Sequence, residues 1–85
     1  MLFIFGNSQI RSFWMKNTLI PLSIGYFDSA KKLVDIQDLD PSPSEMEMNP
    51  KTYPSKKPAQ YALEMNQGWF KKNKFKVGDS IKILK

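Results

Sequence analysis

Two neighbouring segments, residues 22–27 and 33–39, carry the pattern that most constrains the fold of this chain. Large and small side chains alternate in the first segment, the large ones being Leu22, Ile24 and Tyr26 and the small ones Ser23 and Gly25. Alternation with a period of two puts all the large side chains on one face of a β-strand. The polar stretch 28–32 then predicts a hairpin loop, and Val34 and Ile36 should face inward from the second strand.

The N-terminal segment predicts two more strands. Residues 1–5 are apolar and should form an opening strand, Gly6-Asn7-Ser8 should make a turn, and residues 10–15 should return beside the first strand. Residues 40–58 contain five of the six prolines of the chain. Because proline cannot donate to a sheet, regular pairing is not expected there, and we interpret this stretch as a long exposed loop.

The C-terminal part predicts one helix between two strands. Residues 59–65 alternate again, and a last strand is expected over residues 81–85. A short helix is expected near Gln67–Lys72, where Trp69 and Phe70 should pin it to the sheet.

Composition supports a single small domain. Apolar residues make up 41% of the 85 residues and aromatic residues 13%, which is enough large side chain for one core and argues against disorder. We therefore expect residues 1–85 to form one mainly β domain, barrel-like or sandwich-like with an α+β tendency, and with one short helix.

The chain has no cysteine and no histidine. Their absence removes disulfide bonds, cysteine-ligated zinc and the commonest general base. The sequence also has no Ser-His-Asp, Cys-His, Walker or dinucleotide-binding motif. We expect neither a metal nor a cofactor and favour a non-catalytic role.

Positive charge is concentrated in the C-terminal part. Residues 1–50 hold four basic and six acidic side chains, a net charge of −2, whereas residues 51–85 hold nine and two, a net charge of +7. A candidate basic patch for nucleic acid or an anionic envelope is Lys71, Lys72, Lys74 and Lys76. The alternative, which we favour, is an ordinary solvated lysine surface. A single arginine argues against sequence-specific DNA recognition.

The candidate ligand-binding residues are Trp14, Lys16, Asn17 and Glu64. An outward Trp14 would offer a flat apolar surface for stacking, and its polar neighbours would offer hydrogen bonds to an unknown ligand or protein. Burial of Trp14 in a small core is the more frequent arrangement. A weaker alternative is a glycan hydrolase that uses the carboxylates of Glu64 and Asp79, with Trp14 as the sugar platform.

The opening residues lack the basic segment of a secretory signal, and no stretch has the length of a membrane span. As given, the chain is expected to be cytoplasmic. It would be exported or periplasmic if a precursor segment had been removed.

Short blocks spread from Met1 to about Ile81 resemble a family signature. They are Phe13-Trp14-Met15-Lys16-Asn17-Thr18, Tyr53-Pro54-Ser55, Pro58-Ala59, Tyr61-Ala62-Leu63-Glu64, Gly68-Trp69-Phe70 and Val77-Gly78-Asp79. The chain is similar to the C-terminal majority of the bacterial and archaeal domain of unknown function 192 family. The resemblance implies a fold but no activity, since none is established for that family.

Three departures from the family pattern matter. The family's first strand and helix are absent here, so a sheet edge should stay open and favour a homodimer. Ser23 stands where the family usually has aspartate, so any chemistry of that carboxylate would be lost. Lys74 stands where the family often has glycine, and a left-handed backbone there would cost about 1 kcal/mol.

Overall fold

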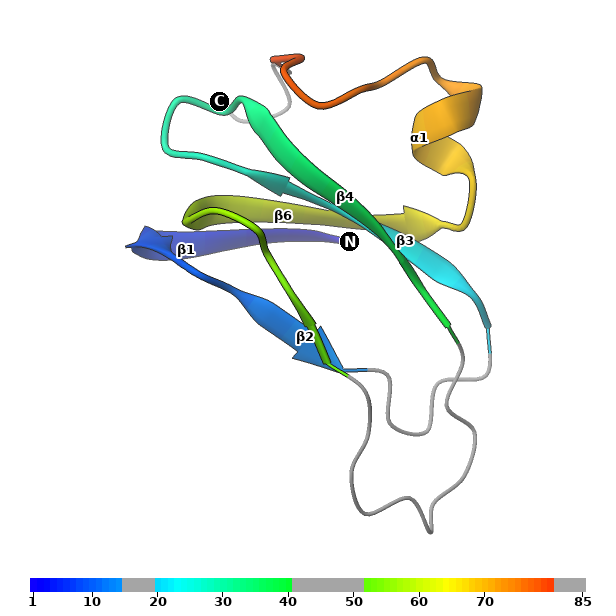
Figure 1. The fold of residues 1–85 in the computed structure, drawn as a ribbon, viewed down its shortest axis with the longest axis horizontal. Coiled ribbons are helices and arrows are strands. Elements are labelled where there is room, and N and C mark those ends of the chain that lie inside the picture. The colour runs from blue at the N-terminus through cyan, green and yellow to red at the C-terminus, as the bar shows by residue number, and fades with distance from the viewer. Residues whose placement is uncertain (15–19, 41–51, 81–85) are drawn as a thin grey trace, which may run out of the picture.

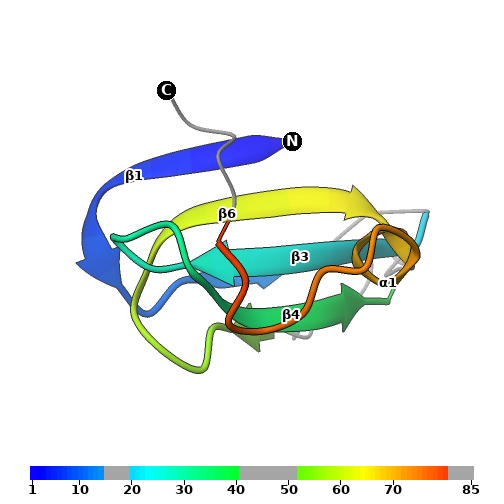
Figure 2. The same ribbon diagram turned by 90° about the horizontal axis from the view of Figure 1, so that it is seen from above.

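The computed structural model of this protein describes residues 1–14, 20–40 and 52–80. Their strands form a four-stranded antiparallel sheet in the order β1-β6-β3-β4 and a two-stranded sheet of β2 and β5 (Figures 1 and 2). The elements are β1 Leu2–Gln9, β2 Ser12–Trp14, β3 Leu22–Phe27, β4 Leu33–Leu39, β5 Thr52–Pro54, β6 Ala59–Asn66 and the helix α1 Trp69–Lys72. The predicted mainly β domain with one short helix is confirmed.

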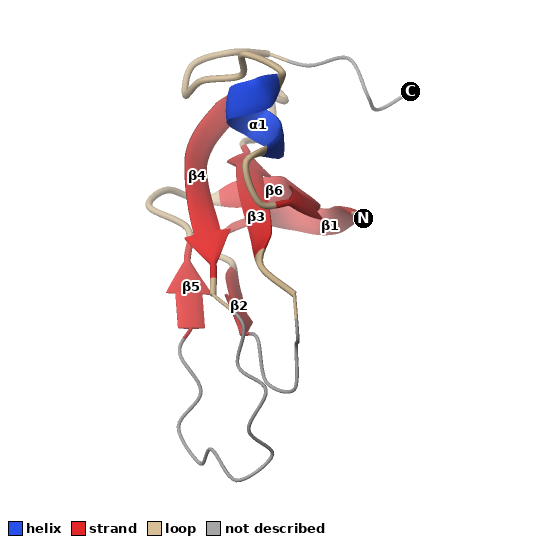
Figure 3. Ribbon diagram, turned by 90° about the vertical axis from the view of Figure 1, so that its right-hand side faces the viewer, coloured by secondary structure: helices blue, strands red, loops and turns tan. Residues whose placement is uncertain are grey.

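Strand β3 is the centre of the larger sheet because it pairs with β4 on one side and β6 on the other. The predicted hairpin is confirmed, with Leu22 opposite Leu39 and Gly25 opposite Ile36. Every residue from Ser23 to Phe27 is buried, since both faces of the strand are covered. Figure 3 shows the small sheet on one side of β3 and α1 on the other.

The main core lies between the two sheets. Ile24 and Tyr26 of β3 pack there with Ala62 of β6 and Tyr53 of β5, all buried. Phe13 of β2 contacts Tyr26, with ring centroids 6.0 Å apart. The Tyr26 hydroxyl donates a hydrogen bond to the carbonyl oxygen of Tyr53, so one side chain of β3 joins the two sheets.

A second apolar cluster covers the opposite face of the large sheet. Phe27 and Leu33 are fully buried there, with Ile36 and Leu63 packed against them. The α1 residue Phe70 is also buried, and its ring lies directly over Gly25. The prediction that Phe70 pins the helix to the sheet is therefore confirmed.

The barrel alternative is wrong, since the two sheets stack without closing on each other. Among the described strands, β1 and β4 each have only one neighbour and form the edges of the larger sheet. The arrangement is sandwich-like. An open edge at β1 matches the expectation from the family departure, but dimerisation through it stays a prediction.

The N-terminal segment forms two strands as predicted, but the predicted turn at residues 6–8 and the pairing of the two strands with each other are wrong. Residues 6–8 do not turn the chain, because β1 continues along β6 as far as the pair of Gln9 and Ala59, after an irregularity beyond Ile4. The change of direction comes at Arg11, whose Nε donates to the Ala59 carbonyl at 3.1 Å and whose backbone N–H donates to Ser55 Oγ at 3.0 Å. These bonds direct β2 towards β5 instead of β1.

The expectation of no regular pairing in residues 40–58 fails at β5, where Thr52–Pro54 pairs with Ser12–Trp14. Proline is tolerated because it occupies the last position of a three-residue strand in a two-stranded sheet. Residues 41–51 and the strand expected over residues 81–85 lie outside the described residues.

Strand β4 does not present Val34 and Ile36 to one interior face. The register shifts so that Tyr26 lies opposite Asp35 and Phe27 opposite Leu33, which leaves Val34 as an extra residue in a β-bulge. Val34 consequently packs against the main core and Ile36 against the second cluster. Both side chains are half-buried.

Replacing Gly25 with alanine should destabilise the protein by about 1–3 kcal/mol, because the new methyl group has no room. Its Cβ would lie 2.7 Å from Cζ of Phe70 and 3.1 Å from Cδ1 of Leu33. Urea unfolding measures the change. Gly6→Ala is the matched control, since nothing lies within 4 Å of the corresponding Cβ. Equal stability of the two variants would show that the contact of Phe70 with β3 does not hold α1 in place.

The buried Tyr26 phenol should make the protein sensitive to alkali. Burial raises the pKa of Tyr26 above its ordinary value near 10, and the charges of Asp35 and Glu64 raise it further. Unfolding therefore releases a proton above about pH 10. The stabilisation from Tyr26 is complete below that pH, and the free energy of unfolding falls by up to about 1.4 kcal/mol per pH unit above it.

Chemical denaturation at a series of alkaline pH values tests the slope, with Tyr26→Phe as the variant that should lose it. Ultraviolet absorbance of tyrosinate gives a second measurement. At about pH 11 the folded wild-type protein and the folded variant should absorb equally, whereas the unfolded chains should differ by one tyrosine. Extra tyrosinate in the folded wild-type protein would contradict the raised pKa.

Candidate functional site

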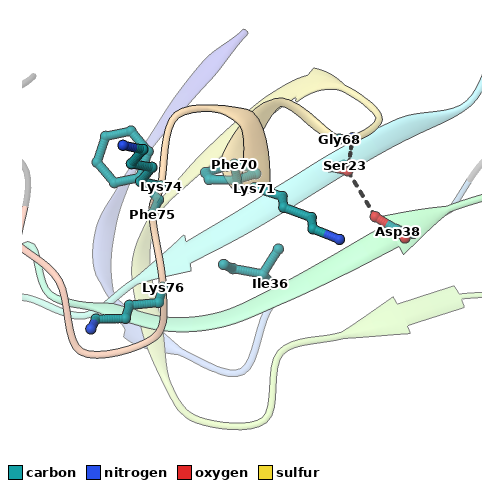
Figure 4. Close-up of a pocket in the computed structure, with 9 residues that line it drawn as sticks. All are labelled: Ser23, Ile36, Asp38, Gly68, Phe70, Lys71, Lys74, Phe75 and Lys76. Atoms are coloured by element: carbon teal, nitrogen blue, oxygen red, sulfur yellow. Dashed lines mark hydrogen bonds between the residues drawn. The ribbon is translucent and has the colours of Figure 1, made fainter.

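A cavity of about 440 Å³ lies between α1, the segment that follows it, and the outer face of β3 and β4 (Figure 4). We call it the α1 pocket. Its lining residues are Ser23, Ile36, Asp38, Gly68, Phe70, Lys71, Lys74, Phe75 and Lys76. Its volume falls within the range of small-molecule sites.

The polar end of the pocket is a fixed pair of side chains from two strands. Ser23 and Asp38 are partners in the β3–β4 register, and Ser23 Oγ donates to Asp38 Oδ1 at 2.8 Å. The same Oγ accepts the backbone N–H of Gly68 at 3.3 Å, which links the start of α1 to the sheet. The second carboxylate oxygen of Asp38 accepts no hydrogen bond from the described residues.

Three exposed lysines line the pocket, and only Lys71 reaches towards this pair. Lys71 extends from α1 over the sheet towards Asp38, whereas Lys76 lies at the other end of the pocket (Figure 4). Neither these two ammonium groups nor that of Lys74 forms an ion pair with a described residue. With Asp38 as the counter-charge, the pocket carries a net charge of about +2, which favours anions.

The wall of the pocket is built from packed aromatic rings. Phe70 and Phe75 meet edge to face with ring centroids 6.3 Å apart, and Trp69 stacks on Phe75 at 5.4 Å. The backbone N–H of Phe75 donates to the Phe70 carbonyl at 2.8 Å. Together with Ile36 of β4, these rings give a surface that a carbon skeleton can contact.

Lys74 has a left-handed backbone, with φ of 61°, which is the conformation in which its departure from the family pattern carries a cost. Its N–H donates to the Lys71 carbonyl at 3.0 Å, so the residue turns the chain where α1 ends. The left-handed turn brings Lys74 to the lining of the pocket.

The structure unites part of the predicted basic patch and separates the predicted ligand site from it. Lys71, Lys74 and Lys76 line one pocket, whereas Lys72 of the same helix is exposed outside it. Glu64 is half-buried. It lies two residues from Ala62 on β6, so both side chains are on the face of the strand that packs in the main core. It therefore lies on the opposite face of the sheet from the α1 pocket.

The remaining predicted site residues are not placed. The backbone of Trp14 pairs with Thr52 at the end of β2. The side chain of Trp14, with Lys16 and Asn17, lies outside the described residues.

The two carboxylates considered for glycan hydrolysis have different surroundings. Asp79 accepts the N–H of Lys76 at 2.9 Å and closes the turn 76–79, whereas Glu64 belongs to the core side of β6. Within residues 1–14, 20–40 and 52–80, no three acidic side chains gather to hold a metal ion.

Asp38 and Phe75 are pocket residues that the sequence analysis missed. The signal for Asp38 was the hairpin register, because pairing Leu22 with Leu39 places Asp38 beside Ser23. Phe75 had no local signal, since its place depends on the turn at Lys74.

Comparison with known protein families identifies an uncharacterised family. The sequence model of the domain of unknown function 192 family, described as an uncharacterized ACR, matches residues 1–83. No curated protein matches the sequence. None of the described helices has the length and apolar character needed to cross a membrane.

Two crystal structures share the fold. One is a protein of unknown function from Novosphingobium aromaticivorans DSM 12444, with 26% identity, a TM-score of 0.82 and 96% of this chain covered. The other, called a "putative transcription regulator", is from Sinorhizobium meliloti 1021, with 32% identity, a TM-score of 0.81 and the same coverage. This chain spans 55% and 60% of the lengths of those two proteins.

Replacing Lys74 with glycine should raise the free energy of unfolding by about 1 kcal/mol, because glycine adopts positive φ without strain. The same change removes one pocket cation, so it should weaken anion binding as it stabilises the fold. Urea unfolding and a phosphate titration measure the two effects. Lys76→Gly is the control, because it also removes a pocket cation but Lys76 does not have positive φ. It should therefore weaken anion binding without stabilising the fold. A Lys74→Gly variant no more stable than the wild type would show that the turn is unstrained.

Proposed function

Since the chain belongs to the domain of unknown function 192 family, which brings no assigned activity, we propose from its geometry that it is a small non-catalytic binding module. Its site is the α1 pocket, and its ligand is a small anion. The observation that supports this most is that three lysines without ion-pair partners among the described residues line one cavity with an apolar wall.

Binding fits the pocket better than catalysis. Ser23 is the hydroxyl nearest to a carboxylate, but it is only 2% exposed, and its oxygen both donates to Asp38 and accepts from Gly68. A nucleophile must reach its substrate and be activated by a base. Ser23 instead holds Asp38 in a fixed orientation.

A second candidate is a basic accessory domain that contacts nucleic acid or an anionic envelope. It is favoured by the exposure of all four lysines of the predicted patch within six residues of sequence. The name of the Sinorhizobium protein, which refers to transcription, points the same way for that protein. A ligand site around Trp14, Lys16, Asn17 and Glu64 stays a separate prediction.

Two neighbouring lysines of α1 distinguish a pocket from a general basic surface. Lys71→Ala should weaken binding of inorganic phosphate roughly three- to tenfold, because Lys71 lines the pocket. Lys72→Ala should change it less than about twofold, since Lys72 lies on the same short helix outside the pocket. Chemical-shift titration at low salt measures both affinities and identifies the residues that respond.

Equal losses in the two variants would contradict the pocket. The surface alternative then gains support if a single-stranded oligonucleotide or anionic vesicles bind with a steep dependence on salt. Failure of phosphate to shift any resonance from Ser23 to Asp38 or from Gly68 to Lys76 would overturn the proposed site.

A further inference from the structure

We infer that the α1 pocket is built for a phosphate monoester that carries a free hydroxyl group. The inference rests on the proposed function, because it assigns a ligand class to the same site. It starts from one cavity that is lined by three lysines, by a carboxylate with one oxygen hydrogen-bonded to Ser23, and by apolar side chains.

Charge balance favours a phosphate monoester. Lys71, Lys74 and Lys76 contribute three positive charges and Asp38 one negative charge, which leaves about +2 in the pocket. A phosphate monoester carries roughly −1.5 to −2 at pH 7 and so compensates this charge. A monocarboxylate compensates half of it, and a zwitterionic amino acid compensates none. A divalent cation would add to it.

Asp38 favours a ligand that also carries a hydrogen-bond donor. Its side chain is exposed, so a ligand that covers it displaces water from the second carboxylate oxygen and must replace the lost hydrogen bond. An ionised carboxylate can only accept hydrogen bonds, and Ser23 satisfies Oδ1 alone. An anion without a donor would bring its own negative charge towards the second oxygen. A hydroxyl group satisfies that oxygen without cancelling the charge of the phosphate, which an ammonium group would do.

The distances between the parts suit a small molecule. Asp38 and Ile36 are two residues apart on one face of β4, which corresponds to about 7 Å. Lys71 extends towards the Asp38 end of the pocket (Figure 4). A phosphate that meets Lys71 and a hydroxyl beside Asp38 can therefore belong to one small ligand, whose carbon atoms lie over Ile36 and Phe70.

Glycerol 3-phosphate and propyl phosphate test the inference, because they have the same three-carbon phosphate ester and differ in their hydroxyl groups. We expect isothermal titration calorimetry or chemical-shift titration of the wild-type protein to give roughly tenfold tighter binding of glycerol 3-phosphate. Lys71→Ala should weaken both esters, and Lys72→Ala should leave both nearly unchanged.

Two variants of Asp38 show whether this carboxylate provides the preference. Asp38→Ala should bind both esters equally, and propyl phosphate more tightly than the wild type does, since a repelling charge is gone. Asp38→Asn keeps an acceptor of the same shape, so it should retain part of the preference for glycerol 3-phosphate. It replaces Asp38→Ala in the test if that variant is too unstable to measure. An unchanged preference in Asp38→Ala would overturn the role of Asp38.

Failure of the inference can be told from failure of the proposed function. If both esters bind the wild-type protein equally and both depend on Lys71, the anion pocket stands and the hydroxyl requirement is wrong. If neither ester binds, the proposed function fails together with the inference. If glycerol 3-phosphate binds as expected, ribose 5-phosphate and adenosine 5′-monophosphate separate two sources of the same chemistry. Tighter binding of ribose 5-phosphate indicates sugar phosphates, and tighter binding of adenosine 5′-monophosphate indicates nucleotides.

Discussion

Burial of β3 from both sides is the constraint on which the structure depends. Its even-numbered residues pack into the core between the sheets, and Tyr26 hydrogen-bonds across that core to Tyr53. Its odd-numbered residues face α1, where Gly25 leaves room for the Phe70 ring. A strand with two covered faces must satisfy two packing requirements at once, so one six-residue segment positions both the second sheet and the helix.

The candidate site is a consequence of this double packing. Once Phe70 is seated on Gly25, the chain after α1 must return over β4, and the turn at Lys74 brings Phe75 back onto Phe70. The return leaves a hollow instead of a closed interface, because lysines occupy the positions beside the rings. Ser23, small enough to be buried below Gly68, supplies the polar end.

Local patterns predicted the elements well, whereas the partners of those elements depended on distant residues. The β3–β4 hairpin, the alternation in β6 and the short helix follow from periodicity alone. The pairing of β2 with β5 does not, because it depends on Arg11 bonding to Ser55 and Ala59, more than forty residues away. The three lysines of the pocket could be predicted from the concentration of positive charge in the C-terminal part of the sequence. The position of Asp38 depends on the pairing of β3 with β4, which places it opposite Ser23.

The hydrogen bond from Gly68 to Ser23 attaches one contiguous stretch of chain to the β3–β4 hairpin at one end of the pocket. Residues 68–76 supply its upper wall, and β3 and β4 supply its base. A molecule held between the two would oppose the lifting of the upper wall. Occupancy would thus be recorded as slower amide exchange in one short segment, with the rest of the sandwich unaffected.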